Sequence, residues 1–93
     1  MGIKFEWDDD KARKNLKKHK VSFEEAVTVF GDFLSITIPD STHSVTEDRW
    51  IIIGESSKRR LVVVVHTERG SRIRMISARQ ATLHERKEYE ANG

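Results

Sequence analysis

The sequence predicts an α+β fold in which helices pack on one face of a small antiparallel β-sheet. Three observations support it: β-branched and alternating apolar residues fill the middle of the chain, a Ser/Thr-x-x-Glu pattern occurs twice, and glycine or serine turns separate the apolar runs. The expected order of elements is β-α-α-β-β-β-β-α. A chain of 93 residues, of which 37% are apolar, suffices for one domain over residues 1–93.

The first third of the sequence predicts a strand and two helices. Residues 3–7 alternate between apolar and charged side chains, which is typical of a short strand at a sheet edge. The aspartates at positions 8–10 suit a helix N-terminus, and a basic helix is expected to run from there to Lys18. A capping-box pattern beginning at Ser22 predicts a second helix that ends at Gly31.

The middle of the sequence predicts the strands of the sheet. Residues 33–38 alternate as in a half-buried strand that ends at Pro39, and residues 40–48 are expected to form a loop. Residues 49–53 and 61–65 are rich in β-branched side chains and predict a hairpin whose second strand is buried on both faces.

The last third of the sequence predicts one more strand and a helix. A tight turn at Gly70 precedes a strand over residues 72–79, whose side chains alternate. A second capping-box pattern, from Thr82, predicts a charged helix that ends near Glu90 and has few apolar contacts.

Composition excludes several classes of function. The absence of cysteine excludes disulfides, thiolate catalysis and thiol-ligated metal sites. The longest apolar run, residues 61–65, is far shorter than the roughly 20 residues that span a membrane, and the N-terminus has no signal-peptide pattern. We therefore expect a cytoplasmic protein without membrane association. The histidines lack a paired ligand spacing, so neither a metal ion nor another cofactor is expected.

Charge is distributed unevenly along the chain. Residues 1–47 hold 7 Lys/Arg against 9 Asp/Glu, whereas residues 48–93 hold 10 against 6, including eight of the nine arginines. Because the guanidinium group matches phosphate oxygens and stays charged, this distribution favours a polyanionic partner. An ordinary solvated surface with balanced ion pairs accounts for the charges equally well.

Cationic side chains near the ends of the central strands suit RNA cleavage. RNA supplies its own nucleophile, the 2′-hydroxyl, so an enzyme must only move protons and stabilise the charge of the transition state. The residues concerned are Arg49, His66, Arg69, Arg72, Arg74 and Arg79.

His66 is the first candidate for proton transfer, because it ends an apolar strand beside the turn at Gly70. A symmetric turn places His66 opposite Arg72 and on the sheet face of Arg74, whereas a slip of one residue separates them. A histidine that only forms a hydrogen bond at the strand end explains the same position. His19, at the C-terminus of the basic helix, is the second candidate, with helix capping as its alternative role.

Three further residues have two possible roles. Arg79 ends the last strand, from which it can reach a cleft, or it forms a salt bridge to Glu85 or Glu88. Trp7 and Trp50 can stack on bases, but their strand patterns favour packing in the core or an interface.

The chain also resembles a known family over nearly its whole length. It is similar to the BrnT family of type II toxins, small ribonucleases whose fold is related to the RelE toxins. The residues that carry the resemblance are Phe5-Glu6-Trp7-Asp8, Asn15, Lys18-His19, Val21-Ser22-Phe23-Glu24-Glu25-Ala26, Arg49-Trp50, Gly54, Val64-Val65-His66-Thr67, Ile76-Ser77-Ala78-Arg79, Glu85-Arg86 and Tyr89.

The resemblance implies a translation-inhibiting ribonuclease with a cognate antitoxin. The partner would be of the BrnA type, whose ribbon-helix-helix dimer binds operator DNA and carries two toxins in a 2:2 heterotetramer. The residues it implies for the active surface are His19, Arg49, His66, Arg69 and Arg79. We expect Lys18, Arg72 and Arg74 to contact RNA as well.

Two other functions fit the same cationic surface. A non-catalytic RNA-binding module would contact phosphates and bases without producing cleavage products. A protein-interaction module with a basic face for an acidic partner would show only salt-sensitive background binding to RNA.

Overall fold

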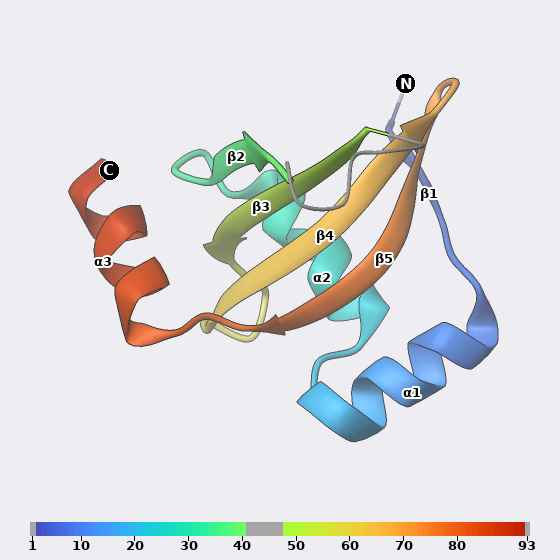
Figure 1. Cartoon of the computed structure of the whole chain (residues 1–93), viewed down its shortest axis with the longest axis horizontal. Helices are drawn as coiled ribbons and strands as arrows, with labels where there is room; N and C mark the ends of the chain where they lie inside the picture. The colour runs from blue at the N-terminus through green and yellow to red at the C-terminus, as the bar shows by residue number, and fades with distance from the viewer. Residues whose placement is uncertain (1, 41–47, 93) are drawn as a thin grey trace.

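The computed structural model describes residues 2–40 and 48–92, which form a five-stranded sheet with three α-helices (Figure 1). The α+β prediction is confirmed, with the strands in the spatial order β1-β5-β4-β3-β2. Most of the loop expected over residues 40–48 lies outside the described residues. The elements in chain order are β1 (Lys4–Glu6), α1 (Asp9–His19), α2 (Phe23–Thr28), the 3₁₀-helix η1 (Val29–Gly31), β2 (Ile36–Pro39), β3 (Arg49–Glu55), β4 (Leu61–Arg69), β5 (Arg72–Gln80) and α3 (Leu83–Asn92).

The sheet is not wholly antiparallel, which corrects the sequence prediction. Strands β2 to β5 pair antiparallel in sequence order, but β1 runs parallel to β5, with Lys4 beside Arg72 and Glu6 beside Arg74. The connection from β1 to β5 is long, because it includes both helices and the strands β2 to β4. It returns the chain to this edge, so β1 can pair with β5 in the parallel direction.

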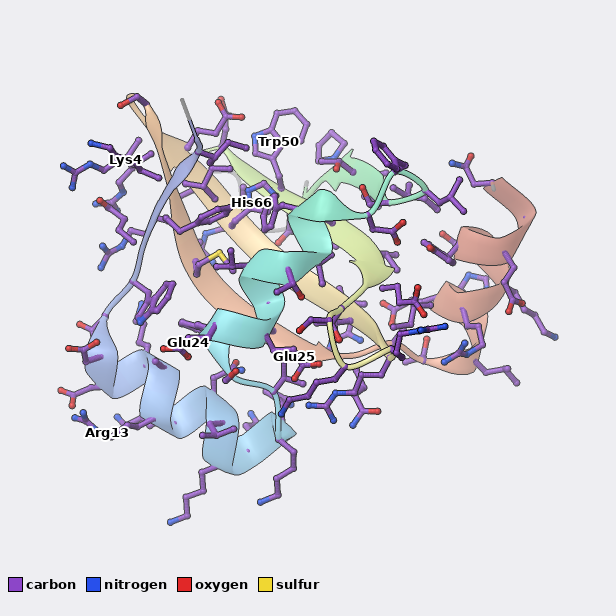
Figure 2. All side chains as sticks on the ribbon, turned by 180° about the vertical axis from the view of Figure 1, so that it is seen from behind. Lys4, Arg13, Glu24, Glu25, Trp50 and His66 are labelled. Atoms are coloured by element: carbon purple, nitrogen blue, oxygen red, sulfur yellow. The ribbon has the colours of Figure 1, made fainter. Side chains whose placement is uncertain are left out.

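The main core lies between the sheet and the first two helices. Figure 2 shows α2 in front of one sheet face, which we call the inner face, while α1 lies beside the β5 edge of the sheet. Side chains of α2 and of alternate strand positions meet there, and the opposite sheet face is called the outer face. The buried residues of this core are Val21, Phe23, Ala26, Val29, Ile52, Val62, Val64, Met75 and Ala78.

The third helix packs against the outer face, so the helices do not all lie on one face as predicted. Ile53 and Val63 follow inner-face residues by one position and therefore point outward, where they are buried with Leu61. Tyr89 of α3 packs against this cluster, but none of the residues 83–92 is itself buried. The turn after β5 carries α3 around the end of the sheet (Figure 1).

Strand β2 begins later than the alternation of residues 33–38 predicts. The Asp32 carboxylate accepts the Leu34 N–H at 2.9 Å, and the Asp32 carbonyl accepts the Ser35 N–H at 3.1 Å, which folds this segment into a turn. Phe33 and Leu34 are consequently exposed, and regular pairing starts at Ile36.

Candidate functional site

The outer face collects the arginines that the sequence analysis singled out. Met75 and Ala78 point into the main core, so their neighbours Arg74 and Arg79 point outward. Arg72 lies two positions before Arg74 and shares its face. The strand register aligns Arg49, Thr67 and Arg74 across three strands, and it places Arg69 opposite Arg72. We call Arg49, Arg69, Arg72 and Arg74 the arginine face.

One carboxylate sits among these cations. Glu6 continues the row on β1, and its two oxygens lie 3.4 Å from Nη1 of Arg72 and 3.3 Å from Nη1 of Arg74. Desolvation raises the pKa of Glu6, but the hydrogen bonds and charges of Arg74 and Arg72 outweigh it, so the pKa is lowered. Both contacts are long and Arg72 is exposed, so the guanidinium groups keep donors that face solvent.

His66 lies on the other face of the sheet, so the predicted grouping with Arg72 and Arg74 is wrong. The β4–β5 hairpin turns tightly at Gly70, which places Thr67 opposite Arg74 and His66 opposite Met75. His66 therefore shares the inner face with Met75 of the main core. Figure 2 shows His66 on this face, and the difference from the prediction is an odd-numbered shift in register, which moves a side chain to the other face of the sheet.

The environment of His66 is apolar. The ring is only 4% exposed and packs edge-on against Phe30, with ring centroids 4.9 Å apart. Within the described residues neither ring nitrogen has a hydrogen-bond partner. Burial lowers the pKa of His66 to about 4, so the ring is neutral at physiological pH. The alternative role as a hydrogen-bonding residue at the strand end is not observed either.

Lys18 and His19 lie in a shallow groove between α1 and β5. The groove encloses about 190 Å³ and is lined by Lys11, Lys14, Asn15, Lys18, His19 and Ile76. Ile76 is the extra residue of a β-bulge, because Val65 pairs with Ser77 and His66 pairs with Met75. Arg74 and Arg79 flank Ile76 along β5, so the groove adjoins the arginine face.

Asn15 holds α1 against the edge of β5. Its side-chain amide donates to the carbonyls of Ala78 at 2.8 Å and Val21 at 2.9 Å, and its oxygen accepts the Ala78 N–H at 3.1 Å. Asn15 is buried, so these three hydrogen bonds satisfy a polar group that would otherwise be costly to bury. One helical turn later His19 and Lys18 reach the groove.

Arg79 is engaged in the salt bridge that was its alternative role. Both terminal nitrogens of its guanidinium group lie 2.8 Å from the carboxylate oxygens of Glu85 in α3. The carboxylate also accepts the Thr82 N–H at 2.8 Å, which completes the capping box. The hydrogen bonds from Arg79 lower the pKa of Glu85 to about 2 despite desolvation.

A second polar contact holds the other end of α3. The Tyr89 hydroxyl donates to Asp32 at 2.6 Å, and the same carboxylate oxygen accepts the Glu55 N–H at 2.8 Å. This hydrogen bond raises the pKa of Tyr89 to about 12. Two polar clamps and the packing of the half-buried Tyr89 ring therefore attach α3 to the sheet.

Lys11 and Lys14 line the groove but were not among the predicted site residues. Their spacing to Lys18, three and then four residues, is the signal for one helix face and is readable from the sequence. Trp7 packs edge-on against Phe23 at 5.8 Å, in agreement with the packing role. Over residues 2–40 and 48–92, no cluster of three His, Asp or Glu side chains is arranged to hold a metal ion, and no helix is long and apolar enough to cross a membrane.

Comparison with known proteins identifies the family of the chain and supports its fold. Residues 7–85 match the family model described as the ribonuclease toxin BrnT of a type II toxin-antitoxin system. The structure is similar to the crystal structure of the Brucella abortus ribonuclease toxin BrnT, with 24% sequence identity, a TM-score of 0.68, and 87% of this chain and 99% of that chain covered. No curated protein matches the chain. The relation to RelE toxins stays a prediction. The family match spans most of the sequence, so the chain belongs to the BrnT family of ribonuclease toxins of type II toxin-antitoxin systems.

Proposed function

We propose that this toxin cleaves RNA through attack of the 2′-hydroxyl, without a metal ion, and that the arginine face binds the phosphates. The observation that carries the proposal is the register, which lines up cations from neighbouring strands on one solvent-facing surface. Arg72 and Arg74 would hold the phosphate through their guanidinium donors, while Arg49 and Arg69 would position the strand. Fixed donors of this kind stabilise a transition-state oxyanion by about 3–4 kcal/mol each.

Proton transfer in this proposal falls to His19. Its ring is half-buried in the groove beside β5, next to the strand that carries Arg74. The burial of His66 beneath Phe30 leaves it out of reach of a substrate on the outer face, so we assign it a packing role. His66→Ala is then expected to weaken folding and to leave the specific cleavage rate of the folded protein within about threefold, whereas His19→Ala is expected to lower it about 100-fold.

We propose further that the antitoxin acts on the outer face and on α3. A BrnA-type ribbon-helix-helix partner would neutralise the toxin in a 2:2 heterotetramer in the cytoplasm. The complex would contact operator DNA only through this partner. The two polar clamps of α3 and the absence of buried residues within residues 83–92 support displacement of this helix by the partner. Displacement would also release Arg79 from Glu85 and add a cation to the outer face.

The proposal is tested with end-labelled RNA in excess EDTA, with and without the product of the neighbouring gene. The expected result is fragments that end in 2′,3′-cyclic phosphate and that disappear when the partner is added. Arg72→Gln with Arg74→Gln removes two such donors and is expected to reduce cleavage by about 10⁴-fold or more. The matched control, Arg59→Gln with Arg86→Gln, removes the same charge from exposed positions elsewhere and is expected to retain activity.

A binding-only function is the second candidate, because His66 faces away from the arginine face. It predicts that RNA binds and stays intact under all these conditions. Cleavage that requires added Mg²⁺ would contradict the metal-independent mechanism while leaving the ribonuclease assignment in place.

A further inference from the structure

We propose that the groove between α1 and β5 binds the sugar-phosphate backbone of a single RNA strand that extends from the arginine face. This inference rests on the proposed function and adds a second contact surface to it. The new elements are Lys11, Lys14 and the bulged Ile76, none of which is needed for the cleavage chemistry.

The lysines of the groove share one face of α1. Residues 11, 14 and 18 are spaced by three and four positions, so they follow one another along a single side of an α-helix. All three side chains are exposed, and no ion pair joins them to a carboxylate within residues 2–40 and 48–92. By contrast, Arg13 on the other side of the same helix pairs with Asp10. The groove side of α1 therefore carries three lysines in a row that have no carboxylate partner among the described residues.

The floor of the groove is apolar and fixed. The bulge gives β5 an additional residue at Ile76, whose side chain lines the groove and is half-buried. Just beyond it, the Asn15 amide satisfies both backbone groups of Ala78, so α1 cannot slide along the strand without breaking hydrogen bonds in the interior. Ile76 offers an apolar surface to a ribose or base, while the lysines offer charge to the phosphates.

The chemistry favours a single RNA strand over an acidic peptide. Lysine ammonium groups are point charges that neutralise phosphates without reading sequence, which suits a flanking strand more than a cleavage point. A volume of about 190 Å³ is below the range of drug-sized pockets, so the groove would contact a ligand along one side and would not enclose it. The groove also adjoins β5 between Arg74 and Arg79, so a strand leaving the arginine face meets it directly.

The test uses a single-stranded oligoribonucleotide that is 2′-O-methylated throughout, because it lacks the nucleophile and cannot be cleaved. Its affinity is measured by fluorescence anisotropy at several salt concentrations. In the groove variant, Lys11, Lys14 and Lys18 are changed to Gln, and in the control variant Lys17, Lys58 and Lys87 are changed to Gln. Gln has nearly the helix propensity of Lys, and circular dichroism checks that both variants fold.

We expect the groove variant to bind at least tenfold more weakly than the control variant. The slope of log affinity against log salt should fall by about 2, since each lost contact to a single-stranded phosphate lowers it by about 0.7. Equal affinities and slopes for the two variants would overturn the inference. A loss of affinity for poly-glutamate but not for the oligonucleotide would overturn it as well, since the groove would then be a protein interface.

Cleavage of unmodified RNA, measured in parallel, separates this inference from the proposed function. A wild-type protein that binds the methylated strand through the groove but leaves ordinary RNA intact would contradict only the nuclease proposal. A wild-type protein that cleaves RNA while the groove and control variants bind equally would contradict only the groove.

Discussion

Helices α2 and α3 begin with the same Ser/Thr-x-x-Glu pattern, and in each the glutamate binds an arginine from another part of the chain, yet they are attached very differently. In α2 the carboxylate of Glu25 is 2% exposed and accepts from Arg60 and from the Ser56 hydroxyl. In α3 the side chain of Glu85 is 20% exposed and its partner Arg79 is 42% exposed.

The difference shows that the pattern fixes where a helix begins but not how firmly it is held. Phe23, Glu25 and Ala26 of α2 are buried, whereas no residue of α3 is. Breaking an ion pair in the interior leaves an unpaired charge out of water, while an exposed carboxylate is rehydrated. We therefore regard α2 as part of the folding core and α3 as an appendage that can detach.

The largest effect is expected from Arg60→Ala. The substitution leaves the buried Glu25 carboxylate without its guanidinium partner and should lower the free energy of unfolding by about 3–5 kcal/mol. Urea denaturation measures this. Arg59→Ala is the control, because Arg59 is 87% exposed and lies 3.6 Å from Glu55. A loss for Arg60→Ala no larger than that of Arg59→Ala would show that the α2 pair is not a core interaction.

Acid should weaken the α2 side before the α3 side. His66 packs against Phe30 of η1, directly after α2, and burial lowers its pKa from 6.5 to about 4. Below pH 6.5 the His66 ring is protonated in the unfolded state but stays neutral in the folded state. The free energy of unfolding should therefore fall by up to about 3 kcal/mol between pH 6.5 and 4.

The control for this pH effect is His66→Met, whose side chain does not titrate. Its stability should stay nearly constant between pH 6.5 and 5, above the range in which the paired carboxylates lose their contribution. A wild-type curve that is equally flat there would contradict the burial of a neutral histidine. The ion pair between Glu85 and Arg79 weakens only at a lower pH. The pKa of Glu85 is lowered from 4.5 to about 2, so its contribution is complete above pH 4.5 and is lost as the pH falls toward 2.

Arg79→Ala should loosen α3 without unfolding the sheet. Loss of the paired hydrogen bonds to Glu85 is expected to lower the local opening free energy of α3 by about 1–2 kcal/mol. Hydrogen exchange should show faster exchange of amides in residues 83–92 and unchanged protection in β4. Equal acceleration in both elements would mean that α3 belongs to the same cooperative unit as the core.

The smallest effect is expected from Tyr89→Phe. The hydroxyl donates to Asp32, but that carboxylate keeps the backbone N–H groups of Leu34 and Glu55 as donors. The local cost should be about 0.5–1 kcal/mol, and it should add to that of Arg79→Ala because the two clamps hold opposite ends of α3. Double-mutant hydrogen exchange checks the sum. Strong non-additivity would indicate that the clamps open together.

The elements themselves could be predicted because their signals are local. The cap at Ser22 and the β-branched runs of β3 and β4 depend only on neighbouring residues, and each appears where expected. The side of the sheet on which α3 packs is not a local property. It follows from the turn after β5 and from the contacts of Tyr89 and Glu85, whose partners are distant in sequence or hidden in the fold.

The site was harder to predict than the fold, since it depends on strand register. The register of the β4–β5 hairpin decides whether His66 lies on the same face as the arginines. The bulge at Ile76 also interrupts the alternation of β5. A bulge leaves no reliable mark in a single sequence. The register brings Arg49, Arg69, Arg72 and Arg74 to one face, whereas the predicted place of His66 on that face is wrong because it assumed a symmetric turn.

The amide of Asn15 also shapes how this protein behaves toward copies of itself. A sheet edge with open backbone groups invites another strand, and β5 extends well past the three residues that β1 covers. Asn15 occupies both groups of Ala78, while the opposite edge strand ends in Pro39, which has no N–H to offer. At both borders of the sheet, therefore, a backbone group that could pair with a strand of another copy is either occupied or absent, which disfavours edge-to-edge association.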